Sequence, residues 1–91
     1  MTQILLVCNA GMSTSILAGK MEELGGGEIK VTAVGVSEYS ERWQGKDILL
    51  IGPQIRFQAD EIRAAVEIPV MVIDFRKYGL VDAAGILGDR G

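Results

Sequence analysis

Four short apolar runs constrain the fold of this chain more than any other feature. They lie at residues 4–7, 31–36, 48–51 and 70–73, and each is rich in branched aliphatic side chains. None shows the strict polar alternation of a strand with one face in water. Runs of this kind are typical of strands that are buried on both faces, as in a parallel sheet.

Amphipathic stretches separate the apolar runs. In the first stretch, hydrophobic residues recur at the three- and four-residue spacing of a helix: Met12, Ile16, Leu17, Met21 and Leu24. The glycines at 25–27 then favour the end of that helix, because glycine accepts the left-handed conformation that closes a helix.

Three further helices are predicted along the chain. Residues 37–42 suit a short helix with Ser37 as its N-cap. After the third apolar run, a stripe predicts another helix with Pro53 near its first turn. That stripe consists of Ile55, Ala59, Ile62 and Val66. The pattern weakens after the fourth run, where Asp82 could cap a final short helix through Leu87.

The order of these elements predicts the fold class. Strands alternate with helices as βαβαβαβ, followed by a short terminal helix. That order predicts an α/β fold with a four-stranded parallel sheet, right-handed crossovers and helices on both faces. No internal repeat, low-complexity segment or linker interrupts the chain, so residues 1–91 are expected to form a single domain.

Composition excludes several kinds of chemistry. The chain has 91 residues, with one Cys, no His and a net charge of −3. One thiol cannot close an intramolecular disulfide, and the usual zinc ligand sets and histidine-based catalysis are excluded, so no metal is expected. The acidic balance argues against nucleic acid as a partner. No membrane-length apolar run or signal peptide is found, which predicts a cytoplasmic protein.

Ligands on open parallel sheets bind where the strands end, and the only thiol follows the first strand. Small and polar residues lead from Cys8 into the predicted helix: Asn9, Ala10, Gly11, Met12, Ser13, Thr14 and Ser15. Converging backbone N–H groups and the helix N-terminus make such a loop an anion site, most naturally for phosphate. The same positive field favours the thiolate form of a cysteine.

Other known loops fit this segment less well. It lacks the G-x-x-x-x-G-K-[ST] pattern of a nucleotide-binding loop, and no second cysteine forms a thioredoxin motif. It resembles the loop of protein tyrosine phosphatases, but Thr14 replaces the arginine that lies six residues after the cysteine. Without that cation a phosphoryl carrier is favoured over a phosphatase. A buried structural Cys8 followed by ordinary helix capping is the alternative.

The segment from Cys8 to Ser15 resembles the phosphorylation loop of the enzyme IIB component of bacterial sugar phosphotransferase systems, lactose/cellobiose (diacetylchitobiose) type. Residues 50–55 and 73–82 extend the resemblance over nearly the whole chain. The resemblance implies four parallel strands with flanking helices and a longer C-terminal helix than this sequence suggests.

The resemblance also implies a function. Cys8 would accept a phosphoryl group from a phosphohistidine of the cognate IIA protein and pass it to a sugar held by the membrane transporter IIC. Asn9 to Ser15 would hold the phosphate, and no cofactor is implied beyond the covalent phosphocysteine. The protein would be cytoplasmic and peripheral to the membrane through IIC. The sugar, for example cellobiose, chitobiose or lactose, is not determined by these residues.

A few other residues receive roles from their positions. Gln54 and Tyr78 lie where they could reach the rim of the loop, with helix-start solvation and core packing as their alternative roles. Asp74 ends the fourth run, and a turn or capping role is favoured because its carboxylate would repel phosphate. Core packing is favoured over partner contact for the apolar residues Met12, Ile55, Phe57 and Trp43.

Two other functions stay open on these residues. One is a low-molecular-weight cysteine-dependent phosphatase, which Thr14 disfavours. The other is a non-catalytic regulatory domain of the IIB type in which Cys8 is only structural.

Overall fold

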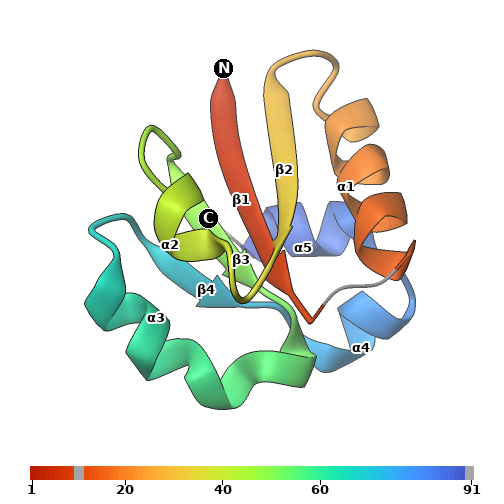
Figure 1. Ribbon diagram of the computed structural model, residues 1–91. Coiled ribbons are helices and arrows are strands. Elements are labelled where there is room, and N and C mark those ends of the chain that lie inside the picture. Colours follow the sequence, from red (N-terminus) through yellow and green to blue (C-terminus); the bar gives the residue numbers. More distant parts are fainter. Residues whose placement is uncertain (10–11, 90–91) are drawn as a thin grey trace.

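The four apolar runs form one parallel sheet with the strand order β2-β1-β3-β4. The strands are β1 (Thr2–Cys8), β2 (Ile29–Gly35), β3 (Ile48–Ile51) and β4 (Val70–Val72). The computed structural model in Figure 1 describes residues 1–9 and 12–89. The predicted four-stranded parallel sheet is therefore confirmed, with β1 at its centre between two partners.

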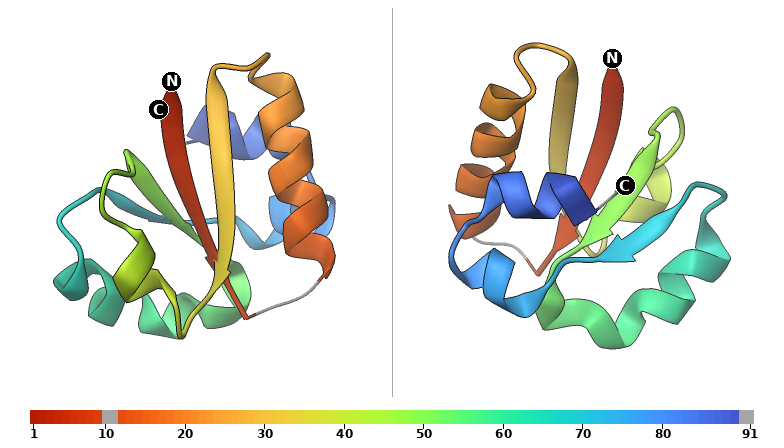
Figure 2. Two further views of the ribbon diagram at one scale, coloured as in Figure 1. Left: turned by 45° about the horizontal axis from the view of Figure 1, so that its top comes forward. Right: turned by 180° about the vertical axis from the view of Figure 1, so that it is seen from behind.

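Helices cover both faces of the sheet, as predicted (Figure 2). The helical segments are α1 (Met12–Leu24), α2 (Tyr39–Arg42), the 3₁₀ segment η1 (Pro53–Gln58), α3 (Ala59–Ala65), α4 (Phe75–Gly79) and α5 (Ala83–Asp89). One face packs against α1, α4 and α5, and the opposite face packs against α2, η1 and α3.

Alternation along β1 divides the core into two clusters. Leu6 and Cys8 face the cluster that contains α1, α4 and α5, whereas Leu5 and Val7 face the cluster on the other side. All four side chains are buried, because β1 is covered on both faces and paired on both edges. The last residue of this strand, Cys8, therefore ends inside the first cluster.

The edge strand β4 is less buried than the sequence predicted. All three of its residues are only partly buried, and the first fully buried side chain of that run is Ile73, just beyond the strand. The strand pairs with β3 alone, so one of its edges has no neighbouring strand. Its apolar side chains pack against the two core clusters but remain partly exposed.

Ser37 is not the N-cap of the second helix, so that prediction is wrong. The helix begins at Tyr39, and Glu38 occupies the cap position without a side-chain cap bond. A turn precedes it, in which the Glu38 backbone N–H donates to the carbonyl of Gly35 at 3.0 Å. Because of this turn after β2, the helix begins two residues later than predicted.

The helix predicted after the third run is broken in the structure. Pro53–Gln58 forms 3₁₀ turns with a non-helical residue at Ile55 (φ −118°, ψ 24°), and the α-helix begins only at Ala59. Ile55 is buried, as expected for the stripe, but Phe57 is 77% exposed. Core packing was therefore the wrong prediction for Phe57, because the kink turns its position away from the core. Trp43 packs against the second cluster, as predicted.

The helix α4 was not predicted, whereas the capping role of Asp74 is confirmed. The carboxylate oxygen Oδ1 of Asp74 accepts from the backbone N–H groups of Arg76 (2.9 Å) and Lys77 (3.2 Å). These bonds satisfy two of the N–H groups that a helix start leaves without partners. A five-residue helix without apolar periodicity depends strongly on such a cap.

The C-terminal helix follows Asp82 as predicted, and it extends two residues beyond the predicted end at Leu87, to Asp89. Asp82 precedes α5 and accepts from the backbone N–H of Gly85 at 3.0 Å. Between α4 and α5, the Asp82 N–H donates to the carbonyl of Lys77 and the Val81 N–H to that of Tyr78. This pattern closes α4 as a Schellman motif, with Val81 in the left-handed conformation (φ 52°) that glycine usually takes.

No helix within the two described stretches has the length and hydrophobicity needed to span a membrane.

Removal of the Asp74 cap tests whether α4 depends on it. We expect Asp74→Ala to lower the free energy of unfolding by about 1 kcal/mol, because two backbone N–H groups lose their acceptor. Asp74→Ser should retain most of the stability, since serine caps helices nearly as well. Urea denaturation at constant m value measures both variants, and equal stability of Ala and Ser would contradict the capping role.

Candidate active site at the carboxyl edge of the sheet

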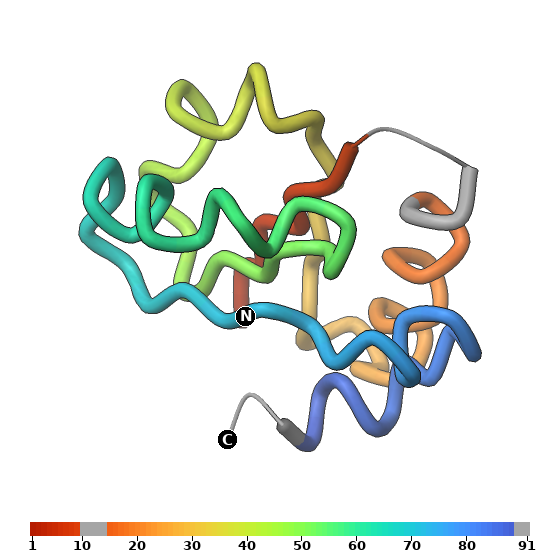
Figure 3. The backbone as a smooth tube through the Cα atoms, turned by 90° about the horizontal axis from the view of Figure 1, so that it is seen from below, coloured from red at the N-terminus to blue at the C-terminus, as the bar shows by residue number. Residues whose placement is uncertain are grey.

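The strand order creates a switch point between β1 and β3. The chain leaves β1 toward α1 on one face of the sheet and leaves β3 toward η1 on the other. Figure 3 looks onto this edge, with α1 on one side and η1 with α3 on the other. Ligands of open parallel sheets bind at such a point, outside the carboxyl ends of the strands.

Cys8 ends β1 at this switch point. Its Cα pairs with that of Gly35 on β2, while the preceding Val7 pairs with Ile51 at the end of β3. The Cys8 side chain is a free thiol that is only 3% exposed. The sequence prediction that this thiol lies at the carboxyl edge is confirmed, and the structure adds that it points into the first core cluster.

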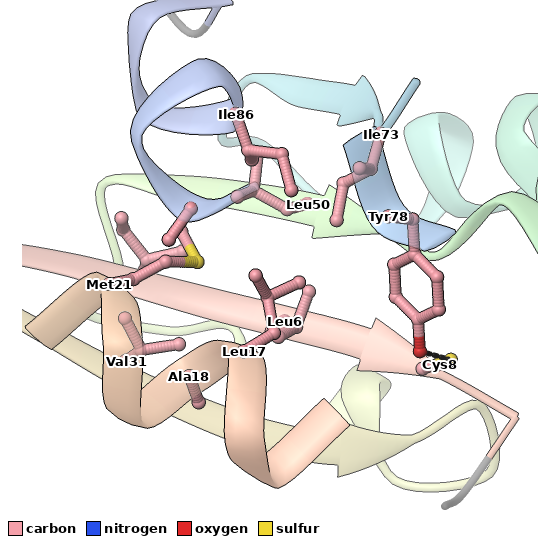
Figure 4. Close-up of a cluster of buried hydrophobic side chains, with 12 residues drawn as sticks. Leu6, Cys8, Leu17, Ala18, Met21, Val31, Leu50, Ile73, Tyr78 and Ile86 are labelled. Atoms are coloured by element: carbon pink, nitrogen blue, oxygen red, sulfur yellow. Dashed lines mark hydrogen bonds between the residues drawn. The ribbon is translucent and has the colours of Figure 1, made fainter. Parts of the chain in front are cut away.

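Two polar side chains from distant parts of the sequence approach the thiol. The hydroxyl oxygen of Tyr78 lies 3.2 Å from the Cys8 Sγ, and both atoms are buried. The amide oxygen Oε1 of Gln54 lies 3.7 Å from the same sulfur, in a geometry that accepts from the thiol. Figure 4 shows the Tyr78 ring reaching down from α4 with its hydroxyl against Cys8. Both residues predicted for the rim therefore reach the thiol itself.

Backbone hydrogen bonds fix the two segments that carry these side chains. The Gly52 N–H donates to the carbonyl of Val7 at 2.8 Å, which extends the β1–β3 hydrogen bonding to Gly52, two residues before Gln54. The Tyr78 N–H donates to the carbonyl of Asp74 at 2.9 Å, in the first turn of the capped helix α4. The Tyr78 ring is itself buried, so its orientation is constrained by packing.

Gly52 is a site residue for which the sequence suggested no role. A Cβ built on Gly52 would lie 2.7 Å from the Cys8 Sγ and 3.2 Å from the Gln54 Oε1. Its backbone (φ −62°, ψ 143°) suits any residue, so glycine is needed here for space and not for conformation. The sequence signals were its place directly after the third apolar run and within residues 50–55, which carry part of the family resemblance.

The predicted phosphate loop is only partly described. Asn9 and Ser15 are exposed. Ala10 and Gly11 lie outside the described residues. The backbone of the next three residues forms the first turn of α1, and their side chains also lie outside the described part; these residues are Met12, Ser13 and Thr14. The helix that follows Cys8 thus begins at the predicted place, with its N-terminus toward the thiol end of β1.

Charged residues lie on the segments that follow β2, β3 and β4, among them Glu38 in the turn after β2. Arg56 on η1 and Arg76 on α4 are both exposed, while the Asp74 carboxylate is engaged in capping. The side-chain atoms described around Sγ, from Gln54 and Tyr78, are uncharged. Exposed arginines on a chain with a net charge of −3 favour the approach of an anion to this edge at low salt.

No cluster of three or more Cys, Asp or Glu side chains that could hold a metal ion occurs among residues 1–9 and 12–89. Among the described side chains, the polar groups at this site are the Cys8 thiol, the Tyr78 hydroxyl and the Gln54 amide oxygen. These groups suit covalent chemistry at sulfur and hydrogen bonding to an anion.

Known proteins are similar in sequence to this chain over most of its length. The family model described as "PTS system, Lactose/Cellobiose specific IIB subunit" matches residues 3–89. The oligo-beta-mannoside-specific EIIB component of Bacillus subtilis is 41% identical over 88 residues, covering 90% of this chain and 85% of that protein. The cellobiose-specific EIIB component of Lactococcus lactis is 33% identical over 95 residues, covering 92% and 88%.

Two solved structures share the fold. The solution structure of a cellobiose-specific IIB component from Borrelia burgdorferi is 30% identical, with a TM-score of 0.75 over 96% of this chain and 85% of that one. A lactose-specific IIB domain from Streptococcus pneumoniae has a TM-score of 0.79 over 97% and 93%, at 13% identity.

The fold and the site define an α/β domain with one thiol at the switch point of a parallel sheet. The chain belongs to the lactose/cellobiose-specific IIB family of the phosphotransferase system. Members of that family are phosphotransferases that take part in sugar transport.

A substitution at Gly52 tests the close approach of this residue to the Cys8 sulfur. We expect Gly52→Ala to lower the free energy of unfolding by about 1 to 3 kcal/mol, because the new methyl group overlaps Sγ and forces it away from Tyr78. Urea denaturation measures the loss, and the NMR shift of the Cys8 Cβ reports the movement of the thiol.

Gly35→Ala is the matched control, since a Cβ at that position meets no atom within 4 Å. It should leave the stability unchanged or raise it by up to about 1 kcal/mol, through the lower entropy of the unfolded chain. Equal stabilities of the two variants would contradict the close approach of Gly52 to Cys8.

Proposed function

We propose that this protein is a phosphoryl carrier of sugar uptake and that Cys8 is the residue that carries the phosphoryl group. The single observation that supports this most is the position of the chain's only thiol, at the switch point of the sheet and at the start of α1. Membership of the IIB family supports the same role. The donor is then the phosphohistidine of a IIA protein, and the acceptor is a sugar bound by a IIC transporter.

Each transfer exchanges one bond to phosphorus for another. In the first, a lone pair of the Cys8 thiolate forms the S–P bond while the P–N bond of phosphohistidine breaks and its electron pair stays on the imidazole nitrogen. In the second, a sugar hydroxyl oxygen forms the O–P bond while the S–P electron pair returns to sulfur. The hydroxyl proton passes to a base beside the sugar. The chain has no His, which agrees with histidine chemistry on the donor.

The proposed phosphate site is the segment from Asn9 to Ser15. Its backbone N–H groups and the hydroxyls of Ser13, Thr14 and Ser15 are the donors available for the phosphoryl oxygens. The N-terminus of α1 adds partial positive charge at the same place. Gln54 is proposed as a rim residue on the basis of its 3.7 Å approach to Sγ.

Thr14 favours a carrier over a phosphatase. Phosphatases of the related loop type use an arginine at this spacing to hold the transferring group in two hydrogen bonds. A threonine at that position removes the cation that would stabilise the hydrolytic transition state. The phosphocysteine is then expected to survive in water until it meets its acceptor.

The sugar itself is proposed only as a class. The relatives are described as specific for oligo-beta-mannosides, galactose and cellobiose. These names vary while the IIB sequences stay similar, which agrees with sugar recognition on the transporter. We propose a β-linked disaccharide or related glycoside as the acceptor and the cytoplasmic face of IIC as the place of transfer.

Intact mass measures the proposed phosphorylation. After incubation with phosphoenolpyruvate, the general phosphotransferase proteins and the cognate IIA, we expect the mass of one phosphoryl group to be added per chain. Cys8→Ser should gain none, because it lacks the thiolate nucleophile. No mass gain with an IIA that is itself phosphorylated would contradict the carrier function.

A phosphatase assay distinguishes the carrier function from the main alternative, a cysteine-dependent phosphatase. Sustained release of phosphate from p-nitrophenyl phosphate by the wild-type chain, abolished in Cys8→Ser, would favour the phosphatase. The carrier proposal predicts no turnover above that of the variant.

A further inference from the structure

The buried contact between Tyr78 and Cys8 joins a phenol to the thiol that the proposed function uses. The hydroxyl oxygen and Sγ are 3.2 Å apart, and the residues are 8% and 3% exposed. We propose that the Tyr78 hydroxyl is a catalytic hydrogen-bond donor to the Cys8 thiolate. It would stabilise the sulfur anion both before it accepts the phosphoryl group and after it releases it. This inference rests on the proposed carrier function.

The two neighbours of the sulfur have different hydrogen-bonding abilities. The Gln54 Oε1 can only accept, so it pairs with the thiol and not with a thiolate. The phenol of Tyr78 can both accept and donate. When Cys8 loses its proton, Tyr78 can turn its O–H toward the new charge by rotation about one bond, whereas Gln54 would have to turn its amide over to present its Nε2–H group. A hydrogen bond to an ionised acceptor in a buried place is about twice as strong as a neutral one.

The position of Tyr78 is held independently of the thiol. Asp74 caps α4 one turn before Tyr78, and a Schellman motif closes the helix directly after it. The ring packs in the first core cluster (Figure 4). A donor fixed in this way loses little entropy when the sulfur becomes charged, so its hydrogen bond is preorganised.

Charged groups also lie near the start of the segments that follow β2, β3 and β4. They are Arg56 on η1, Glu38 in the turn after β2, and Asp74, Arg76 and Lys77 at the start of α4. Each of them is retained when only the Tyr78 hydroxyl is removed. A comparison of the wild-type chain with Tyr78→Phe therefore isolates the hydroxyl.

A donor at the sulfur acts in both half-reactions. During acceptance, it raises the fraction of Cys8 present as thiolate at a pH below the titration midpoint. During release, the S–P bond breaks and its electron pair returns to sulfur, where the Tyr78 O–H meets the developing charge. A carrier needs both properties, because the same atom is first the nucleophile and then the leaving group.

The titration of Cys8 tests this assignment without any phosphoryl transfer. Because Cys8 is the only cysteine, labelling of cysteine Cβ with an NMR-active carbon gives one signal that follows its ionisation. We expect Tyr78→Phe to raise the midpoint by about one pH unit, a tenfold change equal to about 1.36 kcal/mol.

Tyr39→Phe is the matched control, since Tyr39 is equally buried but packs in the second cluster, on the other face of the sheet. It should leave the midpoint unchanged. An unchanged midpoint in Tyr78→Phe, or an equal shift in both variants, would overturn the proposal.

A second probe keeps the ring and the hydroxyl in place. In the Tyr39→Phe chain, Tyr78 is the only tyrosine left, so growth on meta-fluorotyrosine labels that position alone. The fluorinated phenol is a stronger donor, and the midpoint of Cys8 should fall. A midpoint that stays or rises would overturn the proposal, even if Tyr78→Phe did not fold.

The pH profile of transfer from phosphorylated IIA gives the catalytic readout. In Tyr78→Phe, the thiolate fraction at low pH falls about tenfold, while each more basic thiolate reacts on the order of threefold faster. The variant should thus be about threefold slower below both midpoints and about threefold faster above them. A uniform loss at every pH would show a structural role only and overturn the proposal. If the wild-type chain accepts no phosphoryl group while the midpoints shift as expected, the carrier function fails and the hydrogen bond stands.

Discussion

The structure depends on the burial of one strand, β1, on both of its faces and its pairing on both of its edges. Its apolar side chains alternate between two cores, and the crossover that follows β1 lies on the opposite face of the sheet from the crossover that follows β3. Because the chain turns to different faces after β1 and β3, the switch point of the sheet lies where those strands end. Cys8 is the last residue of β1, so the strand that organises the core also places the thiol at that switch point.

The sequence predicted most of the sheet and the thiol's place in it, because burial of a parallel sheet leaves a plain pattern of branched aliphatic runs. The bounds of α1 followed from its periodicity and the glycines after it. The errors lie where local backbone geometry overrides periodicity. The kink at Ile55 exposes Phe57, and a turn after β2 displaces the cap from Ser37. A five-residue helix such as α4 is too short to have a period.

Contacts at the site were less predictable than its location. Gln54 and Tyr78 could be named as rim residues from their places after strands, but their approach to one sulfur depends on strand order and on the Asp74 cap. The role of Gly52 could not be read from the sequence, since it depends on the distance between two backbones. Under the proposed function, the absence of His and the single Cys have one explanation: the chain would take its phosphoryl group from the histidine of a partner protein. The fold would then need only to present one sulfur, stabilise its anion and let it release the phosphoryl group.

The most direct test of the account is a phosphorus–proton correlation spectrum of the chain after phosphorylation by its IIA partner. The account predicts one phosphorus signal that is coupled through the S–P bond to the Cβ protons of Cys8, with further shifts in Asn9, Ser15 and Gln54. A phosphorus signal coupled to the protons of a serine or threonine, with Cys8 unchanged, would contradict it.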